Sequence, residues 1–380
     1  MNLKKQPVLI YNASLITKDR IIDDAWVLCK GRKIVRCGRG KRFPAVKADK
    51  INIHKAYLAP GFIDLHIHGD PYKISQSQAK YGTTSFLLSL HAESNYKRIG
   101  SVAKSLPSLK LSGAKCLGLH LEGPFISKKM CGAQPKKHIL KPDRIWLKNL
   151  LGYAEKKIRI ITLACELDGA IPLIKLLKKN GVVAALGHSN ASFEQTLTAV
   201  DAGANYGTHV FNSMGGLSAR DPRIITAMLI DQRLMTEVIA DGKHVHWALL
   251  KLLAQSKPEE KIVLVTDSVA ALDNYRGKLK KGVYYISEHT FAGSNLNMMQ
   301  AVENMVKYTG ISIVSAVKMA SYNPARVLGV THEKGIIAPG KDADMVVFDR
   351  NFKVNLTIVN GTGIFYSSKK FVRDKGLSPL

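Results

Sequence analysis

The sequence predicts an α/β protein: a (β/α)8 barrel of the TIM type, joined to a small β-sandwich domain formed by both chain ends. Two observations carry this prediction. Eight short apolar runs rich in β-branched residues recur through the middle of the chain, and stretches with helical spacing separate most of them. The two ends instead carry strand-like pieces and turns, without a helical pattern between them.

The length of 380 residues suits one large and one small domain, because a barrel alone reaches about 250 residues. We expect the barrel to cover 58–334 and the small β domain to combine 1–57 with 335–380. No run approaches the roughly 18 consecutive apolar residues of a membrane span, and the apolar stretches near the start are too short for a signal peptide. The expected location is the cytoplasm, without a membrane partner.

Continuous apolar runs are typical of strands that are buried on both faces of a parallel sheet. We assign the barrel strands to 59–67, 83–90, 115–122, 158–165, 181–188, 204–211, 236–242 and 261–267. Helical spacing is clearest in 142–156, 171–179, 193–202, 247–255 and 296–328, the last of which leads from the barrel to the C-terminal strands.

The chain is strongly basic, with 56 Lys+Arg against 29 Asp+Glu and a formal net charge of +27. A positive field raises encounter rates with anions, whether nucleic acid, anionic lipid or a phosphorylated metabolite. The densest basic segment, 30–42, contains no aromatic residue of the kind that stacks on single-stranded nucleic acid. We therefore expect a solvated basic surface and no specific nucleic-acid partner.

Polar residues at the ends of the predicted strands indicate where the chemistry lies. The first strand ends in Asp64-Leu-His66-Ile-His68, and because side chains alternate along a strand, His66 and His68 project to the same side. Other predicted strands carry a histidine or carboxylate at the corresponding end: Glu122, His188, His209 and Asp267. In a barrel these ends converge at one mouth, where active sites of this fold lie.

Together these residues form a ligand set for two divalent metal ions. Imidazole and carboxylate ligands suit zinc or iron, and either Glu122 or Asp267 could bridge the ions. Such a centre supplies a hydroxide and polarises a carbonyl, while a neighbouring carboxylate passes the proton to a leaving amine. The expected reaction class is hydrolysis of an amide or a related C–N bond. The alternative for any single histidine is a hydrogen-bonded core residue; we assign His120 to the layer beneath the ligands and leave His91 open.

The same motifs resemble a known family. PGFIDLHIHG (60–69) is similar to the first-strand signature of the amidohydrolase superfamily, and GIIAPGKDADMVVFD (335–349) to the segment by which such chains return to the small β domain. More specific motifs resemble, in order, the N-acetylglucosamine-6-phosphate deacetylase family: LHLEGPFIS (119–127), LGHSNAS (186–192), THVFNSM (208–214), IADGKHV (239–245), LVTDS (264–268) and FAGSNLNM (291–298). They cover nearly the whole predicted barrel.

The resemblance implies a metal centre and a reaction. Glu122, His188 and His209 match the metal ligands shared across the family, and His66 and His68 match the further pair of members that hold a second metal. Asp267 matches the catalytic acid/base and completes the ligand set. The implied cofactor is one or two divalent ions per subunit, zinc or iron. The implied reaction is attack of a metal-bound hydroxide on N-acetyl-D-glucosamine 6-phosphate, which yields D-glucosamine 6-phosphate and acetate.

The resemblance also implies contacts with the substrate. Arg220 and His244 match positions that grip the phosphate, partly from the neighbouring subunit of a homodimer. An arginine suits this task because its planar guanidinium matches the phosphate oxygens. Other matched positions line the pocket: Ala133, Gln134, Asn212, Ser213, Phe291, Ala292 and Gly293.

Gln134 departs from the family pattern. Many relatives have a histidine at the place where this chain has Gln134, in a segment that reads MCGAQP at 130–135. A glutamine amide donates a hydrogen bond to a developing oxyanion but carries no charge. We hypothesise that this exchange accompanies the His66/His68 pair, with a second metal taking over part of the polarisation.

Alternatives stay open on this scaffold and away from it. The substrate could be N-acetylgalactosamine 6-phosphate or another N-acyl compound, because no motif decides the sugar epimer. A dihydroorotase-like site needs a lysine at the end of the fourth strand, where this chain reads Ala164-Cys165-Glu166. A non-enzymatic anion-binding protein would explain the charge, but it has no use for both the ligand set and Asp267.

Overall fold

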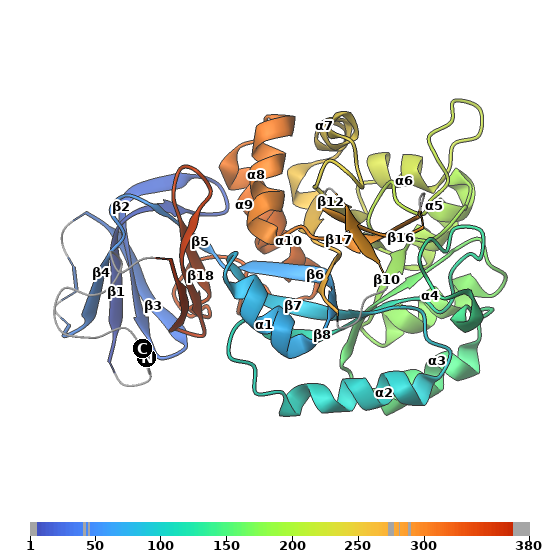
Figure 1. Cartoon of the computed structure of the whole chain (residues 1–380), viewed down its shortest axis with the longest axis horizontal. Helices are drawn as coiled ribbons and strands as arrows, with labels where there is room; N and C mark the ends of the chain where they lie inside the picture. Colours follow the sequence, from blue (N-terminus) through green and yellow to red (C-terminus); the bar gives the residue numbers. More distant parts are fainter. Residues whose placement is uncertain are drawn as a thin grey trace.

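Eight parallel strands, β6 to β13, organise most of the chain (Figure 1). The structure, a computed structural model, describes residues 6–40, 43–44, 46–272, 277–280, 282–287 and 290–367. The barrel strands are β6 (Phe62–Gly69), β7 (Thr83–Leu90), β8 (Lys115–Glu122), β9 (Ile158–Leu163), β10 (Val183–Leu186), β11 (Tyr206–Gly207), β12 (Met235–Ile239) and β13 (Ile262–Val265). The predicted (β/α)8 barrel is confirmed.

Helices follow the strands and pack against the barrel. They are α1 (Pro71–Ala79), α2 (Tyr96–Ser105), α3 (Arg144–Tyr153), α4 (Ala170–Lys179), α5 (Phe193–Ala202), α6 (Ile224–Ile230), α7 (Trp247–Ser256), α8 (Met298–Thr309), α9 (Ile313–Ala320) and α10 (Tyr322–Val327). Their starts are encoded locally: the side chains of Asp70, Asn95 and Asp143 each accept two backbone N–H groups of the first turn. Across the described ranges, no helix has the length and apolar character that crossing a membrane requires.

The first and last barrel strands meet and close the barrel. The backbone N–H of Asp267 donates to the carbonyl oxygen of His66 at 2.8 Å. Nearby, the Asp64 carboxylate accepts hydrogen bonds from the hydroxyl and the backbone N–H of Thr266, at 2.5 and 3.3 Å. Burial raises the pKa of Asp64 to about 7 even though these hydrogen bonds oppose the shift. These four residues form the barrel seam, which ends directly at the predicted metal ligands.

After β13 the chain makes an excursion before α8. It comprises β14 (Ser268–Ala271), β15 (Lys278–Lys280), β16 (Val283–Ser287) and β17 (Thr290–Ser294). β14 pairs in parallel with β6 and β17, whereas β15, β16 and β17 form an antiparallel meander. Residues 291–293, which the resemblance placed in the pocket lining, lie on β17.

Strands from both chain ends share a second sheet, which lies beside the barrel (Figure 1). It contains β1 (Val8–Ile16), β2 (Ile21–Lys30), β3 (Lys33–Arg39), β4 (Asp49–Asn52), β5 (Tyr57–Pro60), β18 (Met345–Phe348), β19 (Val354–Val359) and β20 (Thr362–Tyr366). The ends are joined where β18 pairs antiparallel with β5, with Met345 opposite Pro60. The predicted sandwich form and limits of this part stay predictions, and residues 1–5, 41–42, 45 and 368–380 lie outside the described residues.

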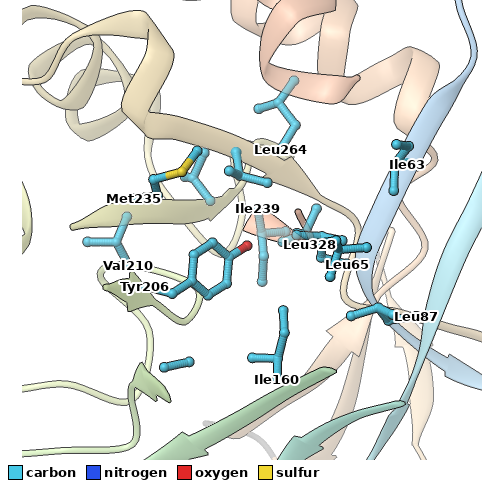
Figure 2. Close-up of a cluster of buried hydrophobic side chains, with 14 of the residues drawn as sticks. Ile63, Leu65, Leu87, Ile160, Tyr206, Val210, Met235, Ile239, Leu264 and Leu328 are labelled. Carbon is cyan, nitrogen blue, oxygen red and sulfur yellow. The ribbon is translucent and has the colours of Figure 1, made fainter. Parts of the chain in front are cut away.

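Apolar side chains fill the barrel below its mouth. Ile160, Tyr206 and Ile239 come from three different strands, are fully buried and point toward one another (Figure 2). The Tyr206 hydroxyl has no hydrogen-bond partner among the described residues. The barrel is therefore a packed core with a floor, and its polar groups can be reached only from the mouth.

Candidate active site

A cavity of about 330 Å³ lies at the carboxyl ends of the barrel strands, a volume suited to a small molecule. Its walls are His68, His91, Glu122, Gly132, Ala133, Gln134, His188, His209, Asn212, Ser213, His244, Asp267, Thr290, Phe291, Ala292 and Gly293. All predicted site residues except two line this cavity. His66 is fully buried next to the cavity, and Arg220 lies on an exposed loop.

Glu122, the last residue of β8, lies at the centre, and its two oxygens face different histidine pairs. Oε1 is 2.9 Å from Nε2 of both His188 and His209. Oε2 is 3.5 Å from Nε2 of both His66 and His68. Burial raises the pKa of Glu122, but the positive charge of His66 and hydrogen bonds from the other histidines outweigh burial and hold it well below the usual range. Of the two carboxylates, Glu122 is the one placed between both histidine groups.

Four ligand atoms converge where His66, His68 and Asp267 meet Glu122. The two Nε2 atoms of His66 and His68 are 3.2 Å apart, and Asp267 Oδ1 lies 3.6 and 3.3 Å from them. A tetrahedron with edges of this length has its corners about 2.0–2.2 Å from its centre, which is the range of zinc–nitrogen and zinc–oxygen bonds. These residues therefore fit a divalent metal.

Glu122, His188 and His209 form the second group of candidate ligands. His188 Nδ1 donates to the carbonyl oxygen of Met130 at 2.8 Å, which orients the ring so that Nε2 faces Glu122. The backbone also bends at these ligands: φ is 47° at His188, 24° at His209 and 47° at Asp267, in the left-handed region that non-glycine residues rarely adopt. Such backbone strain clusters at functional sites.

Gln134 is held by two hydrogen bonds. Its Nε2 donates to Glu122 Oε2 at 2.6 Å, and its Oε1 accepts the backbone N–H of Ala92 at 2.8 Å. We expected the Gln134 amide to face a developing oxyanion, whereas in the structure it contacts the carboxylate of Glu122, a candidate metal ligand. A charge-assisted hydrogen bond of this kind orients Glu122.

His244 also lines the cavity. Its Nδ1 donates to Asp241 Oδ2 at 2.6 Å, so Nε2 remains available for a ligand. The imidazole packs edge-on against Phe291, with ring centroids 5.1 Å apart. Arg220 does not line this cavity.

Several site residues were missed or left open by sequence reasoning. His91, which was left open, lines the cavity and stacks on His68 with ring centroids 4.3 Å apart; burial lowers its pKa to about 4. Gly132 and Thr290 also line the cavity but carried no signal. Glu237 was missed, although the sequence carries a signal for it: a carboxylate in the middle of an apolar run, on what the structure shows as β12.

Comparisons with known proteins agree with this geometry. Residues 57–363 match the model of the amidohydrolase family. N-acetylglucosamine-6-phosphate deacetylase of Lysinibacillus sphaericus is 34% identical over 89% of this chain and 92% of its own. N-acetylgalactosamine-6-phosphate deacetylase of Escherichia coli O157:H7 is also 34% identical, over 80% of this chain and 86% of its own. A solved structure of the Mycobacterium smegmatis N-acetyl-D-glucosamine-6-phosphate deacetylase is also similar; it is an aspartate-to-alanine variant in complex with N-acetyl-D-glucosamine 6-phosphate. It superposes with a TM-score of 0.85 at 30% sequence identity, and the match covers 94% of this chain and 99% of that one.

Proposed function

Because this chain belongs to the amidohydrolase family, we propose that it is a metal-dependent deacetylase that hydrolyses N-acetyl-D-glucosamine 6-phosphate to D-glucosamine 6-phosphate and acetate. The observation that carries the proposal is the position of Glu122, whose two oxygens face separate histidine pairs while Asp267 stands at the cavity wall. An anion-binding protein has no need for this arrangement. The resemblance to solved deacetylases supports the choice of substrate.

The candidate ligands divide into two sets that share Glu122. His188 and His209 would hold one divalent metal, and His66, His68 and Asp267 would hold a second; zinc or iron suits these donors. When bound, such a centre supplies an activated water and polarises the acyl carbonyl.

Asp267 is the group that we assign to proton transfer. Its carboxylate takes a proton from the attacking water and gives it to the departing amine. Two backbone contacts hold it in place: its N–H donates to His66 O at 2.8 Å, and its carbonyl oxygen accepts Ser294 N–H at 2.9 Å. The Asp267 carboxylate is therefore fixed against the cavity before substrate arrives.

The phosphate would bind at the His244 end of the cavity, away from the reacting amide. Asp241 orients the His244 imidazole, and a phosphate anchored there would position the acyl group at the metal ligands. We propose a homodimer in which Arg220 serves the cavity of the partner subunit. Its exposed loop position, outside the cavity of its own subunit, supports this. The cytoplasm stays the predicted location.

A second candidate substrate is N-acetylgalactosamine 6-phosphate. It is favoured by the Escherichia coli O157:H7 relative, which is named as a deacetylase of that epimer and is 34% identical to this chain, as the Lysinibacillus sphaericus relative is. Acetate release from both epimers and from unphosphorylated N-acetylglucosamine, with metal content measured on the same sample, tests the proposal. We expect fast release from N-acetylglucosamine 6-phosphate, loss of release with a chelator and far slower release without the phosphate. No release with metal bound would move the substrate to another N-acyl compound; no release and no metal would favour an anion-binding protein.

A further inference from the structure

Glu237 is a fully buried carboxylate on β12, beneath the metal ligands. Within the described ranges, no lysine or arginine pairs with it; its one ion-pair contact is with His66. Burying a carboxylate is costly and its partners must offset that cost, so the pairing of Glu237 with His66 in the barrel interior calls for a specific function.

One oxygen of Glu237 contacts ligands of both metal groups. Oε1 accepts a hydrogen bond from His66 Nδ1 at 2.7 Å and from the backbone N–H of His209 at 2.9 Å. A carboxylate only accepts, so the proton of this pair lies on His66 Nδ1. With Nδ1 committed to Glu237, Nε2 is the atom that would give its lone pair to a metal, and it faces His68, Glu122 and Asp267.

The neighbouring His120 does not make Glu237 part of a third metal site. His66, His120 and Glu237 lie close enough to hold an ion. Both ring nitrogens of His120 are already engaged, however: Nδ1 with the Leu65 carbonyl oxygen at 2.9 Å and Nε2 with the Thr162 hydroxyl at 2.8 Å. His120 is thus a hydrogen-bonded core residue, and Glu237 acts on the site above through His66.

We propose that Glu237 is a positioning residue that makes the His66–His68–Asp267 group competent to bind a metal. It fixes the tautomer and ring plane of His66, and through the His209 backbone it holds the ligands of the two groups in one frame. Carboxylate partners of ligand histidines of this kind typically contribute 10–100-fold to metal affinity. The inference concerns metal loading, so it is independent of which N-acyl compound is the substrate.

Titration of metal-free protein with Zn²⁺, followed by calorimetry and by metal analysis of the dialysed product, tests the inference. We expect two metals per subunit in the wild type. Glu237→Leu removes the acceptor and should weaken the second binding phase about 100-fold; Glu237→Gln keeps an acceptor oxygen without the charge and should weaken it about 10-fold. The first phase, due to His188 and His209, should change less in both variants.

Two further variants bracket the result. His66→Ala removes the ligand itself and defines the one-metal state. Thr236→Val removes a buried polar group from the adjacent position of the same strand and should leave both phases unchanged. A wild type that binds one metal, or an unchanged second phase in the Glu237 variants, would overturn the inference. If circular dichroism shows that Glu237→Leu does not fold, the second binding phase of Glu237→Gln alone decides. A wild type that binds both metals but releases no acetate would count against the proposed reaction and not against this role.

Discussion

Replacing Asp267 with asparagine isolates proton transfer from the rest of the site. Asp267 has φ of 47°, and asparagine tolerates this left-handed backbone well, whereas alanine would be strained there. The contacts to His66 O and Ser294 N involve only the backbone and persist in the variant. The amide oxygen can still face the Nε2 atoms of His66 and His68, which lie 3.6 and 3.3 Å away in the wild type. What the variant lacks is a group that accepts a proton.

The expected loss in kcat for Asp267→Asn is about 10²–10⁴-fold, or about 2.7–5.5 kcal/mol in activation free energy. Acetate release under saturating substrate measures it, with metal content determined on the same sample and substrate affinity measured by calorimetry. Retained metal, retained affinity and lost turnover would assign proton transfer to this carboxylate. A fully metal-loaded variant that keeps more than about a tenth of wild-type kcat would refute the reasoning.

Four further outcomes follow from the structure. Arg220→Ala and Asp267→Asn should each be nearly inactive at low substrate concentration. When the two variants are mixed in equal amounts and exchange subunits, half of the dimers hold one intact site, so the mixture should regain about a quarter of wild-type turnover. No recovery would place Arg220 at the cavity of its own subunit. Gln134→Leu removes the hydrogen-bond donor to Glu122 and should weaken metal binding about 10–100-fold in chelator competition, and unchanged affinity would argue against a role of this hydrogen bond in orienting Glu122. Burial lowers the pKa of Lys257 from 10.5 to about 8, so the unfolded state binds this proton more tightly than the folded state. The free energy of unfolding should therefore rise as the pH increases from about 8 to 10.5. Denaturant titrations should show this rise in the wild type but a flatter profile in Lys257→Met. Ile160→Ala should lower the free energy of unfolding by about 2–5 kcal/mol in urea titrations, and a loss below 1 kcal/mol would mean that the barrel floor closes over the gap.

The sequence predicted the parts of the molecule that periodicity and local chemistry encode. β7 and β8 occupy the predicted ranges 83–90 and 115–122, because buried strands of a parallel sheet are uninterrupted apolar runs. The ligands were found because each polar residue follows such a run, and the fold then brings the strand ends together.

The remaining features depend on contacts that no local pattern records. The predicted strand 204–211 is reduced to Tyr206–Gly207, because the chain turns into left-handed conformations at His209 and Phe211. The partner of Gln134 could not be read from its segment, since Gln134 lies in the irregular loop after β8 and only the fold returns this loop to Glu122 at the end of that strand. Glu237 lies on a strand that was correctly expected, but its importance appears only when His66 is placed beside it.

The barrel seam has a consequence for how the protein matures. The candidate metal ligands begin at His66 in the first barrel strand and are complete only when Asp267 docks beside it. During synthesis, the His66–His68–Asp267 group therefore cannot form until the last barrel strand has been made and has closed the ring. Metal binding at this group therefore requires a closed barrel. A nascent chain that stops short of β13 contains His66 and His68 but lacks Asp267, so the group is incomplete.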